Sequence, residues 1–476
     1  MTQPRLPSCR RANRREFLRL GGGLAAMACL PSAQAAPGTG WEEATEILAR
    51  IKPPVFADRE FAVTGYGAIG DGKTDCTAAI ARAIAECNGA GGGRVVFPEG
   101  VFFTGPIHLK SNVNLHVPAG AVLKFAQEPS RYLPVVYTRW EGVECMNYSP
   151  LIYADGQENI AVTGAGTLDG QADSDHWWPW KGRRDSGQVG GLPNQNKARN
   201  RLFEMGQKDV PVGDRVFGEG GYLRPSFIQP CHSKNVLIEG VTIRNSPMFE
   251  INPVLSTNVT VRGVRISSHG PNNDGCDPDS STDVLIEDCT FDTGDDCIAI
   301  KSGRNRDGRR VGVPTENVII RHCQMKDGHG ALTVGSEMSG GVRNVFVENC
   351  KLDSPNLNQA FRFKTNAMRG GTIEHVFFRD IAIGQVSDAV LQIDFMYEEG
   401  EAGPERPIVR DIEIRNVTCG KSEYALELRG FGSSPIRDIR LENCSFDRIA
   451  KPNVLEHVEG LKLTSVTMNG KPMAGL

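Results

Sequence analysis

Short stretches of alternating apolar and polar residues recur along the carboxyl-terminal half of the 476-residue chain. In each stretch the residues one, three, six and eight positions after an anchor residue are apolar, if cysteine and methionine are counted as apolar. Successive anchors lie 22 to 36 residues apart. The anchors are Asn235, Asn258, Asp283, Asn317, Asn344, His375, Asp411, Asp438 and Gly460.

This alternation predicts the backbone of each repeat. A period of two indicates strands, and the shift between the third and sixth positions indicates two short strands joined by a bend. The fifth position is usually Gly, Asn or Asp, which tolerate a left-handed backbone. One repeat cannot bury its apolar row alone, whereas stacked repeats form a continuous core. We therefore predict an all-β fold, a parallel β-helix, which should be right-handed because parallel crossovers overwhelmingly are.

Two segments upstream depart from this repeat. Residues 74–89, TDCTAAIARAIAECNG, have a Thr/Asp start, helical periodicity and a terminal glycine. We predict that they form an amphipathic helix that caps the amino-terminal end of the solenoid. Residues 171–225 are rich in Trp, Arg, Gly and Asn and fit no coil, so we expect a long insertion over one face.

The cysteines follow the same repeat. Four of the thirteen stand at the sixth position, where other repeats have Val or Ile, and we predict that they are buried free thiols stacked along the core. They are Cys289, Cys323, Cys350 and Cys444. The pattern leaves open whether Cys76 and Cys87 form a disulfide.

The amino terminus has the composition of an export signal. The core NRREFLRL precedes a short apolar stretch and a small-residue A-x-A site at residues 33–35. It resembles the twin-arginine signal, and its apolar stretch is too short for a membrane span. We expect a signal peptide at 1–36, a lead-in at 37–59 and a single β-helix domain at 60–476. The protein should be periplasmic or secreted, without stable membrane insertion once the signal is removed.

Charge excludes one class of partner. The formal net charge is −4 and residues 1–36 contribute +5, so the remainder carries −9. General nucleic-acid binding requires a basic face, so no nucleic-acid partner is expected.

Carboxylates and a histidine fall at matching positions of consecutive coils. Equivalent positions on neighbouring coils lie about 4.8 Å apart. Asp295 and His329 each stand four residues after the eighth position of their coil, and the preceding coil brings Asp274 to the same region. Since crowded carboxylates cannot all ionise cheaply, one can stay protonated to donate while its neighbours, such as Asp296, accept.

Cations are predicted beside these acids. Arg362 and Lys364 alternate with Phe361 and Phe363 in a strand, so the phenylalanines should face the core and the cations should face outward. By the same counting Lys301 should face the surface groove.

Four motifs carry a family resemblance. They are NNDG at 272–275, GDDC at 294–297, GHG at 328–330 and RFK at 362–364. In this order on a β-helix they resemble the signatures of glycoside hydrolase family 28, the polygalacturonases, which have a pectin-lyase-like solenoid. The resemblance spans roughly residues 60–470. Two positions depart from the usual motifs: Asn273 stands where the family usually has threonine, and Phe363 where it usually has isoleucine.

The resemblance implies roles for individual residues. Asp295 would be the general acid, Asp274 and Asp296 would hold and deprotonate the attacking water, and His329 would tune the acid. The implied substrate contacts are Arg362 and Lys364 on the substrate carboxylate, together with Lys301 and Tyr397. The expected partner is a pectic polysaccharide or oligogalacturonate, with no cofactor and no metal. The family inverts anomeric configuration, which would place the acid and base roughly 6.5–9.5 Å apart.

The mode of attack is the finer question. IAIKSGRNRDGRRVGVP and GHGALTVGSEMSGGVRNV look more like the bacterial exo-acting members, and insertions at 130–148, 171–225 and 302–314 could wall off one end of a groove. The basic residues of the last insertion either neutralise an anionic chain end or form a solvated loop; they are Arg304, Arg306, Arg309 and Arg310. We expect an exo-polygalacturonase that is monomeric. The alternatives are rhamnogalacturonan hydrolysis or another pectic specificity, a calcium-dependent pectate lyase, and a non-catalytic carbohydrate-binding solenoid.

Overall fold

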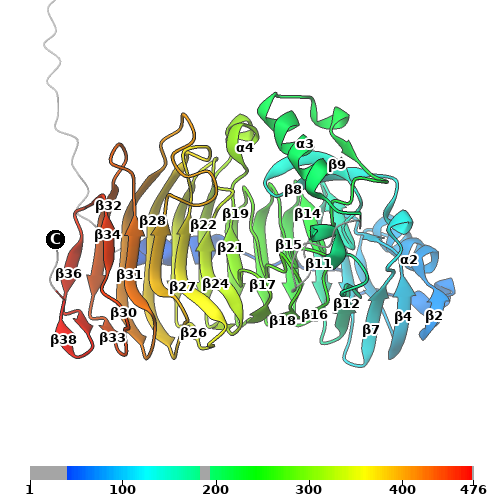
Figure 1. Cartoon of the computed structure of the whole chain (residues 1–476). Coiled ribbons are helices and arrows are strands. Elements are labelled where there is room, and N and C mark those ends of the chain that lie inside the picture. The colour runs from blue at the N-terminus through cyan, green and yellow to red at the C-terminus, as the bar shows by residue number, and fades with distance from the viewer. Residues whose placement is uncertain (1–39, 183–192, 474–476) are drawn as a thin grey trace, which may run out of the picture. The chain divides into compact units, whose positions relative to one another are not determined.

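A row of parallel strands runs along residues 40–182 and 193–473, which are the residues that this computed structural model describes (Figure 1). The anchors from Asn235 to Asp438 all lie in this first row, and each strand pairs in parallel with the next. Its strands are β1 (Glu60–Ala62), β3 (Gly93–Val96), β6 (Val113–His116), β11 (Glu158–Thr163), β15 (Lys234–Glu239), β17 (Thr257–Arg262), β19 (Thr282–Glu287), β22 (Thr315–Arg321), β25 (Val342–Glu348), β28 (Thr372–Ile383), β30 (Ile408–Cys419), β32 (Ile436–Glu442), β35 (Val458–Glu459) and β36 (Lys462–Thr464).

A second row follows the bend within each coil, and β28 and β30 are long enough to span both rows. It contains β2 (Asp71–Asp75), β4 (Gly100–Thr104), β7 (Ala121–Phe125), β12 (Thr167–Asp169), β16 (Thr242–Arg244), β18 (Arg265–Ser268), β20 (Thr290–Thr293), β23 (Gln324–Met325), β26 (Lys351–Leu352), β33 (Ser445–Phe446) and β37 (Thr467–Met468), with β38 (Lys471–Pro472) antiparallel to β37.

A third row forms the wall that carries the site. It consists of β5 (Ile107–His108), β10 (Ile152–Asp155), β14 (Ile228–Cys231), β21 (Ile298–Ile300), β24 (Gly328–Val334), β27 (Leu357–Lys364), β29 (Ala389–Asp394), β31 (Tyr424–Arg429) and β34 (Val454–Glu456). Single bridges through Ile251 and Cys276 join β14 to β21, so the row is continuous through the coils between them. The predicted parallel β-helix is confirmed.

Helices and irregular segments lie outside the rows. They are α1 (Trp41–Arg50), α2 (Thr77–Gly89), α3 (Asn196–Gln207) and α4 (Asn305–Val311), the short 3₁₀ turns η1 (Val63–Tyr66), η2 (Pro129–Tyr132), η3 (Trp178–Lys181) and η4 (Val212–Asp214), and the strands β8 (Val136–Trp140), β9 (Val143–Asn147) and β13 (Val216–Phe217). Helix α2 buries Ile80, Ala83 and Ile84 at the amino-terminal end of the coils, as predicted (Figure 1). No helix within the described ranges is long and apolar enough to cross a membrane.

Two left-handed residues shape each of the predicted repeats. The fifth position is left-handed as expected, for example at Asp288 (φ 56°) and Asn349 (φ 54°). The anchor itself is also left-handed, for example Asn317 at φ 60°, which the sequence pattern did not predict. Asparagine side chains offset part of the free-energy cost of this conformation by hydrogen bonding from coil to coil, as when Asn258 Nδ2 donates to Asn235 Oδ1 at 2.7 Å.

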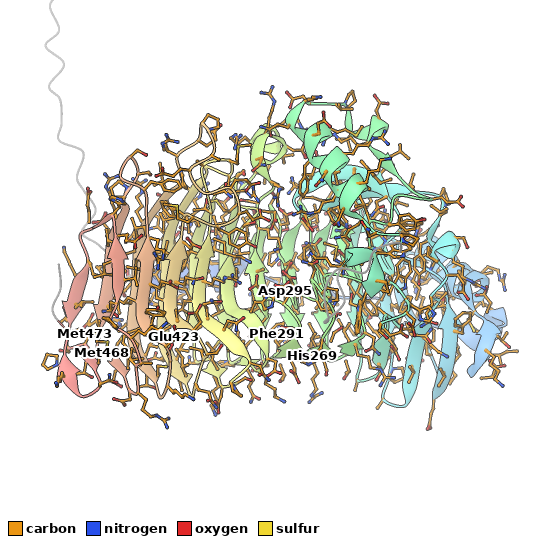
Figure 2. All side chains as sticks on the ribbon, viewed as in Figure 1. His269, Phe291, Asp295, Glu423, Met468 and Met473 are labelled. Atoms are coloured by element: carbon orange, nitrogen blue, oxygen red, sulfur yellow. The ribbon has the colours of Figure 1, made fainter. Side chains whose placement is uncertain are left out.

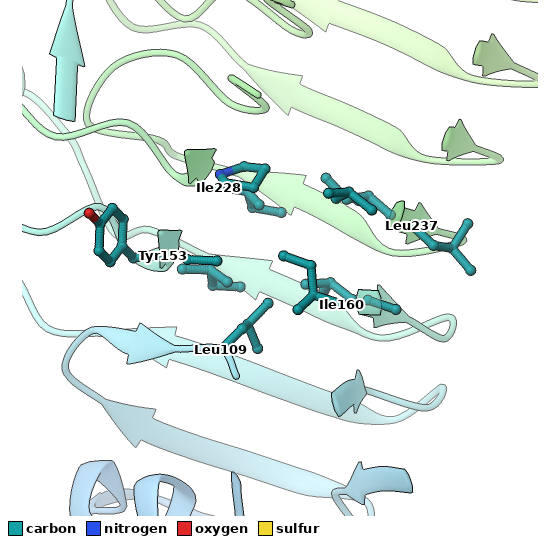
Figure 3. Close-up of a pocket in the computed structure, with 12 residues that line it drawn as sticks. Leu109, Tyr153, Ile160, Ile228 and Leu237 are labelled. Atoms are coloured by element: carbon teal, nitrogen blue, oxygen red, sulfur yellow. The ribbon is translucent and has the colours of Figure 1, made fainter. Parts of the chain in front are cut away.

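The interior is apolar and continuous from coil to coil. Leu109, Ile160 and Ile228, from neighbouring coils, line one small gap in this core (Figure 3). The four cysteines at the sixth position are buried free thiols, as predicted. Cys76 and Cys87, whose pairing the sequence left open, are also free and buried.

The lead-in segment contains a helix for which the sequence pattern gave no prediction. Trp41, Ala44, Ile47 and Ile51 of α1 and the residue after it form a separate apolar cluster on the outer surface of the first row. Their partners stand two positions after the anchors of four consecutive coils: Leu285, Ile319, Phe346 and Phe377. The predicted signal peptide at 1–36 lies outside the described residues.

This packing predicts that α1 stabilises the folded domain. Ile47 is 0% exposed, so Ile47→Ala should lower the thermal midpoint by removing about 2–5 kcal/mol of packing. Glu46→Ala, one residue earlier on the exposed side of α1, is the control and should leave the midpoint unchanged. Equal midpoints for both variants in differential scanning calorimetry would contradict the assigned role of α1.

Candidate active site

Three carboxylates meet on the third row, as the sequence predicted. Asp295 and Asp296 lie directly before β21, and Asp274 lies before Cys276 on the preceding coil, which bridges to Ile298 of β21. One oxygen of each of the three carboxylates lies within 4.8 Å of the other two. Figure 2 shows Asp295 near the middle of the row of coils.

The spacing of these acids differs from the expectation. Consecutive residues on one turn and a neighbour one coil away bring their nearest oxygens to within 4.8 Å, which is shorter than the roughly 6.5–9.5 Å expected for an acid and a base. The three also differ in access: the side chain of Asp295 is 19% exposed, that of Asp274 4% and that of Asp296 0%. Asp295 is therefore the carboxyl that an approaching substrate meets first.

His329 lies on the coil after Asp295 and contacts it directly. Its Nδ1 lies 3.0 Å from Asp295 Oδ1, and its backbone N–H donates to the Asp295 carbonyl at 3.0 Å. The glycine that follows is required here, because a Cβ on Gly330 would lie 2.2 Å from Thr333 Oγ1 and 2.8 Å from Asp296 Oδ1. The glycine-flanked histidine thus reflects close packing around the acids.

Asp296 is held by the predicted cations. Lys364 Nζ donates to Asp296 Oδ2 at 2.6 Å, Thr333 donates to Oδ1 at 2.9 Å, and Arg362 Nη1 lies 3.5 Å from Oδ1. Phe361 and Phe363 face the core as predicted. Lys364 is therefore engaged with an acid of the protein, and Arg362, whose side chain is 17% exposed, is the freer of the two.

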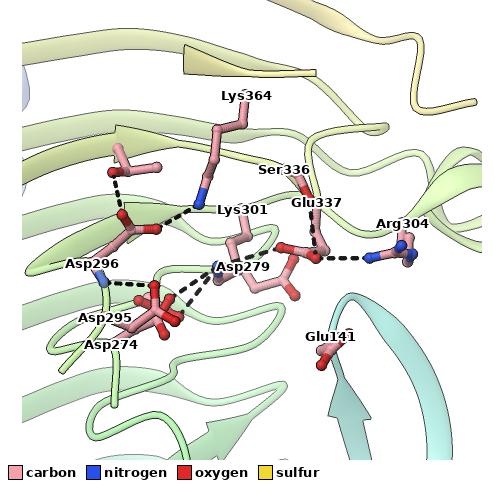
Figure 4. A network of polar contacts seen from close by, with 12 residues as sticks. Glu141, Asp274, Asp279, Asp295, Asp296, Lys301, Arg304, Ser336, Glu337 and Lys364 are labelled. Atoms are coloured by element: carbon pink, nitrogen blue, oxygen red, sulfur yellow. Dashed lines mark hydrogen bonds and ion pairs between the residues drawn. The ribbon is translucent and has the colours of Figure 1, made fainter. Parts of the chain in front are cut away.

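Lys301 corrects one prediction. It was expected to face the surface groove, but it is 3% exposed, because irregular segments outside the coils cover it. Its Nζ lies 3.4 Å from Asp274 and 3.3 Å from Glu337 (Figure 4). It also lies 3.5 Å from Asp277. The contacts with Asp277 and Glu337 hold the ammonium group of Lys301 in place, and this group in turn positions Asp274.

The acids differ in proton affinity for identifiable reasons. Burial and the neighbouring Asp295 raise the pKa of Asp274 to about 7, against the pull of Lys301. Burial opposes ionisation of Asp295 and Asp296 too, but the hydrogen bond from His329 and the charge of Lys364, respectively, hold their pKa values below the usual range. The hydrogen bond to Asp295 raises the pKa of His329 above its ordinary value. In the free protein Asp274 is thus the most readily protonated of the three, whereas the resemblance named Asp295 as the acid.

Two cavities meet at Asp295. The first, here called the chamber, has a volume of about 480 Å³ and is lined by Glu141, Lys181, Arg199, Phe249, Asn272, Asp274, Asp295, Asp296, Lys301, Arg304, Ser336, Glu337, Lys364, Tyr397 and Glu398. The second, here called the groove, has a volume of about 1980 Å³ and is lined by Ser174, Trp178, Pro179, Lys181, His269, Gly270, Pro271, Asn272, Gly294, Asp295, His329, Arg362, Lys364 and Tyr397. Asp295 lines both cavities, with the small polar chamber on one side and the larger groove on the other.

Ion pairs link the segments that wall the chamber. Arg199 of α3 pairs with Glu141 at 2.8 Å and lies 3.7 Å from Glu398. Arg304 pairs with Glu337 at 3.1 Å (Figure 4). It also pairs with Glu398 at 2.9 Å. The sequence predicted that the insertions at 130–148, 171–225 and 302–314 could form a wall, and Glu141, Arg199 and Arg304 come from these insertions. Of the individual wall residues it singled out Arg304 alone, because the others have no place in the repeat from which to count.

The basic residues at 304–310 do not form a free cationic patch. Arg306 pairs with Asp209, Arg309 with Glu405, and Arg310 with Glu144 and Asp307. Arg306 and Arg310 are solvent-exposed, as the solvated alternative holds, but all three are engaged by carboxylates of the protein and so do not wait for an anionic chain end. Arg304, which is 3% exposed and lines the chamber, is the exception.

Tyr397 and Asn273 support the site in different ways. Tyr397 lines both cavities, and its ring centre lies 5.5 Å from Lys364 Nζ and 5.9 Å from the guanidinium carbon of Arg362. Asn273 is 0% exposed and its amide group donates to the carbonyls of Ser246 and Met248. Asparagine at this position thus anchors the turn that presents the neighbouring Asp274.

The same carboxylates have the oxygen chemistry of a calcium site. However, Lys364 Nζ lies 2.6 Å from Asp296 and Lys301 Nζ lies 3.4 Å from Asp274. Two ammonium groups therefore already supply the positive charge that a bound cation would bring, which favours acid–base chemistry over a calcium-dependent lyase.

Fold and site together define an enzyme of the glycoside hydrolase class. Residues 216–459 match the family described as glycosyl hydrolases family 28, and the chain belongs to this family. Residues 61–124 match a second description, rhamnogalacturonase A/epimerase, pectate lyase-like.

Individual relatives agree with this assignment. The crystal structure of a hyperthermoactive exopolygalacturonase from Thermotoga maritima is 48% identical, with a TM-score of 0.89 over 92% of this chain and 98% of that one. A probable polygalacturonase of Vitis vinifera is 29% identical over 83% of this chain and 77% of its own length. An exo-poly-alpha-D-galacturonosidase of Dickeya chrysanthemi is 28% identical over 79% of this chain and 65% of its own length.

The contact between His329 and Asp295 predicts a pH effect. The protonated imidazole is present below its raised pKa and is lost as the pH rises through it, so the basic limb of kcat/KM in the unmodified enzyme should follow His329. In His329→Gln that limb should shift or vanish, and kcat should fall about ten- to hundredfold for the lost charge-assisted hydrogen bond. An unchanged pH–rate profile in the variant would contradict this role.

Proposed function

We propose that the enzyme is an exo-polygalacturonase that hydrolyses α-1,4-galacturonosidic bonds from one end of the substrate chain. The observation that carries this proposal is the chamber, where ion pairs from α3, α4 and the residues around Glu398 wall one side of the acids. A polymer cannot extend through such a wall, so only a chain end fits. The exopolygalacturonase from Thermotoga maritima, which is 48% identical to this chain, supports the same mode of action.

The geometry suggests how the acids divide the reaction. Asp295 stands where the chamber meets the groove, so it is placed to protonate the glycosidic oxygen of a bond that spans the two. Asp274 and Asp296 lie deeper and would hold and deprotonate water beside the sugar in the chamber. A bound uronate adds negative charge and excludes water, which raises the pKa of Asp295 and lets it carry the proton in the complex.

This arrangement fixes the polarity of the substrate. The sugar in the chamber is the one attacked by water, and the leaving group lies in the groove next to His329. The chamber therefore takes the non-reducing end. Arg362, Lys364 and Tyr397 stand at the junction as the proposed contacts of the uronate nearest the bond.

The product pattern tests the exo proposal. Time-resolved chromatography of polygalacturonate digests should show monomer from the start, without a ladder of longer oligomers. The same reaction followed by proton NMR should show the inverted anomer first, as the family resemblance implies for a single displacement, whereas a retained anomer would agree with the short spacing of the acids. A ladder at early times would indicate endo action, and digalacturonate alone would indicate a deeper subsite.

A substrate with a good leaving group tests which carboxyl is the acid. Asp295→Asn should lower kcat on polygalacturonate by about 10²–10⁴-fold but much less on 4-nitrophenyl galacturonide, whose leaving group needs no proton. Asp274→Asn should lower both rates similarly, since a base is needed for either substrate. The opposite pattern would assign the acid to Asp274, in line with its higher pKa in the free protein.

We also propose that residues 1–36 direct export by the twin-arginine route and that the mature enzyme is a periplasmic or secreted monomer. The motif NRREFLRL supports export, and a pectic substrate outside the cell requires it. The described part of the lead-in, residues 40–59, would then belong to the same folded unit as the β-helix, since α1 packs on the coils.

A further inference from the structure

Two cations converge on one neutral oxygen beside the chamber. Lys181 Nζ donates to Asn272 Oδ1 at 2.7 Å, and Arg224 Nη2 donates to the same oxygen at 2.7 Å. Lys181 comes from η3 in the long insertion, and Asn272 opens the motif that contains Asp274. An element outside the repeat therefore reaches the catalytic turn through this oxygen.

Neither cation has a carboxylate partner in the part of the chain that the structure describes. The other donors of Arg224 go to the side-chain oxygen of Gln195 and to the carbonyls of Pro247 and Pro271, all of them neutral. The remaining cations of the chamber wall differ from these two, because each lies within 4.0 Å of a carboxylate; they are Arg199, Lys301, Arg304 and Lys364.

A cation without a contacting carboxylate is costly in such a place. Burial lowers the pKa of Lys181 and lowers that of Arg224 to about 10, and the charges of Glu141 and Asp295, which form no ion pair with either cation, offset this effect only in part. Arg224 is 0% exposed. Buried charges are normally paired, because an unpaired buried charge is strongly destabilising. An anion that enters this space would therefore form hydrogen bonds and neutralise the charge of the two cations.

Lys181 is accessible to such an anion. It lines both the chamber and the groove, as do Asn272, Asp295, Lys364 and Tyr397. Of these, Lys364 is already engaged by Asp296 at 2.6 Å. The protein thus offers a second ammonium group at the junction whose bonding capacity is not taken up by an acid within the described residues.

We propose that Lys181 binds the carboxylate of the galacturonate unit that enters the chamber, with Arg224 holding Asn272 in place and adding positive charge behind it. The assignment deepens the proposed function and rests on it. A uronate on each side of the scissile bond then meets its own cation, Lys181 at the chamber and Arg362 at the groove. Selection of an ionised uronate over its methyl ester at the chain end would follow from this contact.

Binding measurements separate this role from a structural one. In an Asp295→Asn background that does not turn over, isothermal titration with trigalacturonate should give a Kd about ten- to hundredfold higher for Lys181→Met, and Lys181→Arg should restore most of the affinity. The control Lys197→Met, an exposed lysine of the same insertion, should leave the Kd unchanged. Trigalacturonate methyl-esterified at all three carboxyls should bind weakly, and its Kd should be the same for the Asp295→Asn parent and for the parent that also carries Lys181→Met.

A second variant keeps the test decisive if Lys181→Met folds poorly. Asn272→Asp supplies an internal carboxylate to both cations, so it should raise the thermal midpoint while weakening trigalacturonate binding at least tenfold. Unchanged affinity in both Lys181→Met and Asn272→Asp would overturn the inference. Absence of trigalacturonate binding in the Asp295→Asn parent would instead overturn the proposed function.

Discussion

Register between neighbouring coils is the constraint on which the rest of this molecule depends. Parallel pairing fixes residue against residue, as when Ile298, Leu332 and Phe361 align along the third row. Because strands repeat at about 4.8 Å, polar groups at matching positions are forced close together whether or not they repel. The acids at 274, 295 and 296 are crowded for this reason, and their proton affinities follow from the crowding.

That constraint also explains which features were predictable from sequence. Wherever the repeat holds, counting from an anchor is equivalent to measuring in space, so the inward Phe363, the buried cysteines and the contact between Asp295 and His329 could all be foreseen. The outer helix α1 had a partial signal in the apolar residues two places after four consecutive anchors, such as Phe346. Leu237 stands at the same position outside the α1 cluster, and later coils have Glu413 and Arg440 there.

Other features could not be read in this way. Glu141, Lys181 and Arg199 come from segments without a repeat, so no count relates them to the coils that they contact. Lys301, directly after β21, was placed on the correct coil but with the wrong exposure, since the segments that cover it include these same insertions. The pKa of Asp274 lies above that of Asp295 in the free protein, and this order depends on the distances to Lys301 and His329, which a linear pattern does not contain.

The outer helix has a mechanical consequence. A solenoid is held only by contacts between adjacent coils, so it can fray from either end one coil at a time. Helix α1 lies across β19, β22, β25 and β28, the coils that also carry Asp295, His329 and Arg362 on another wall. Helix α1 links these four coils by packing across them, so the end coils can unfold locally while the coils that carry the site stay together.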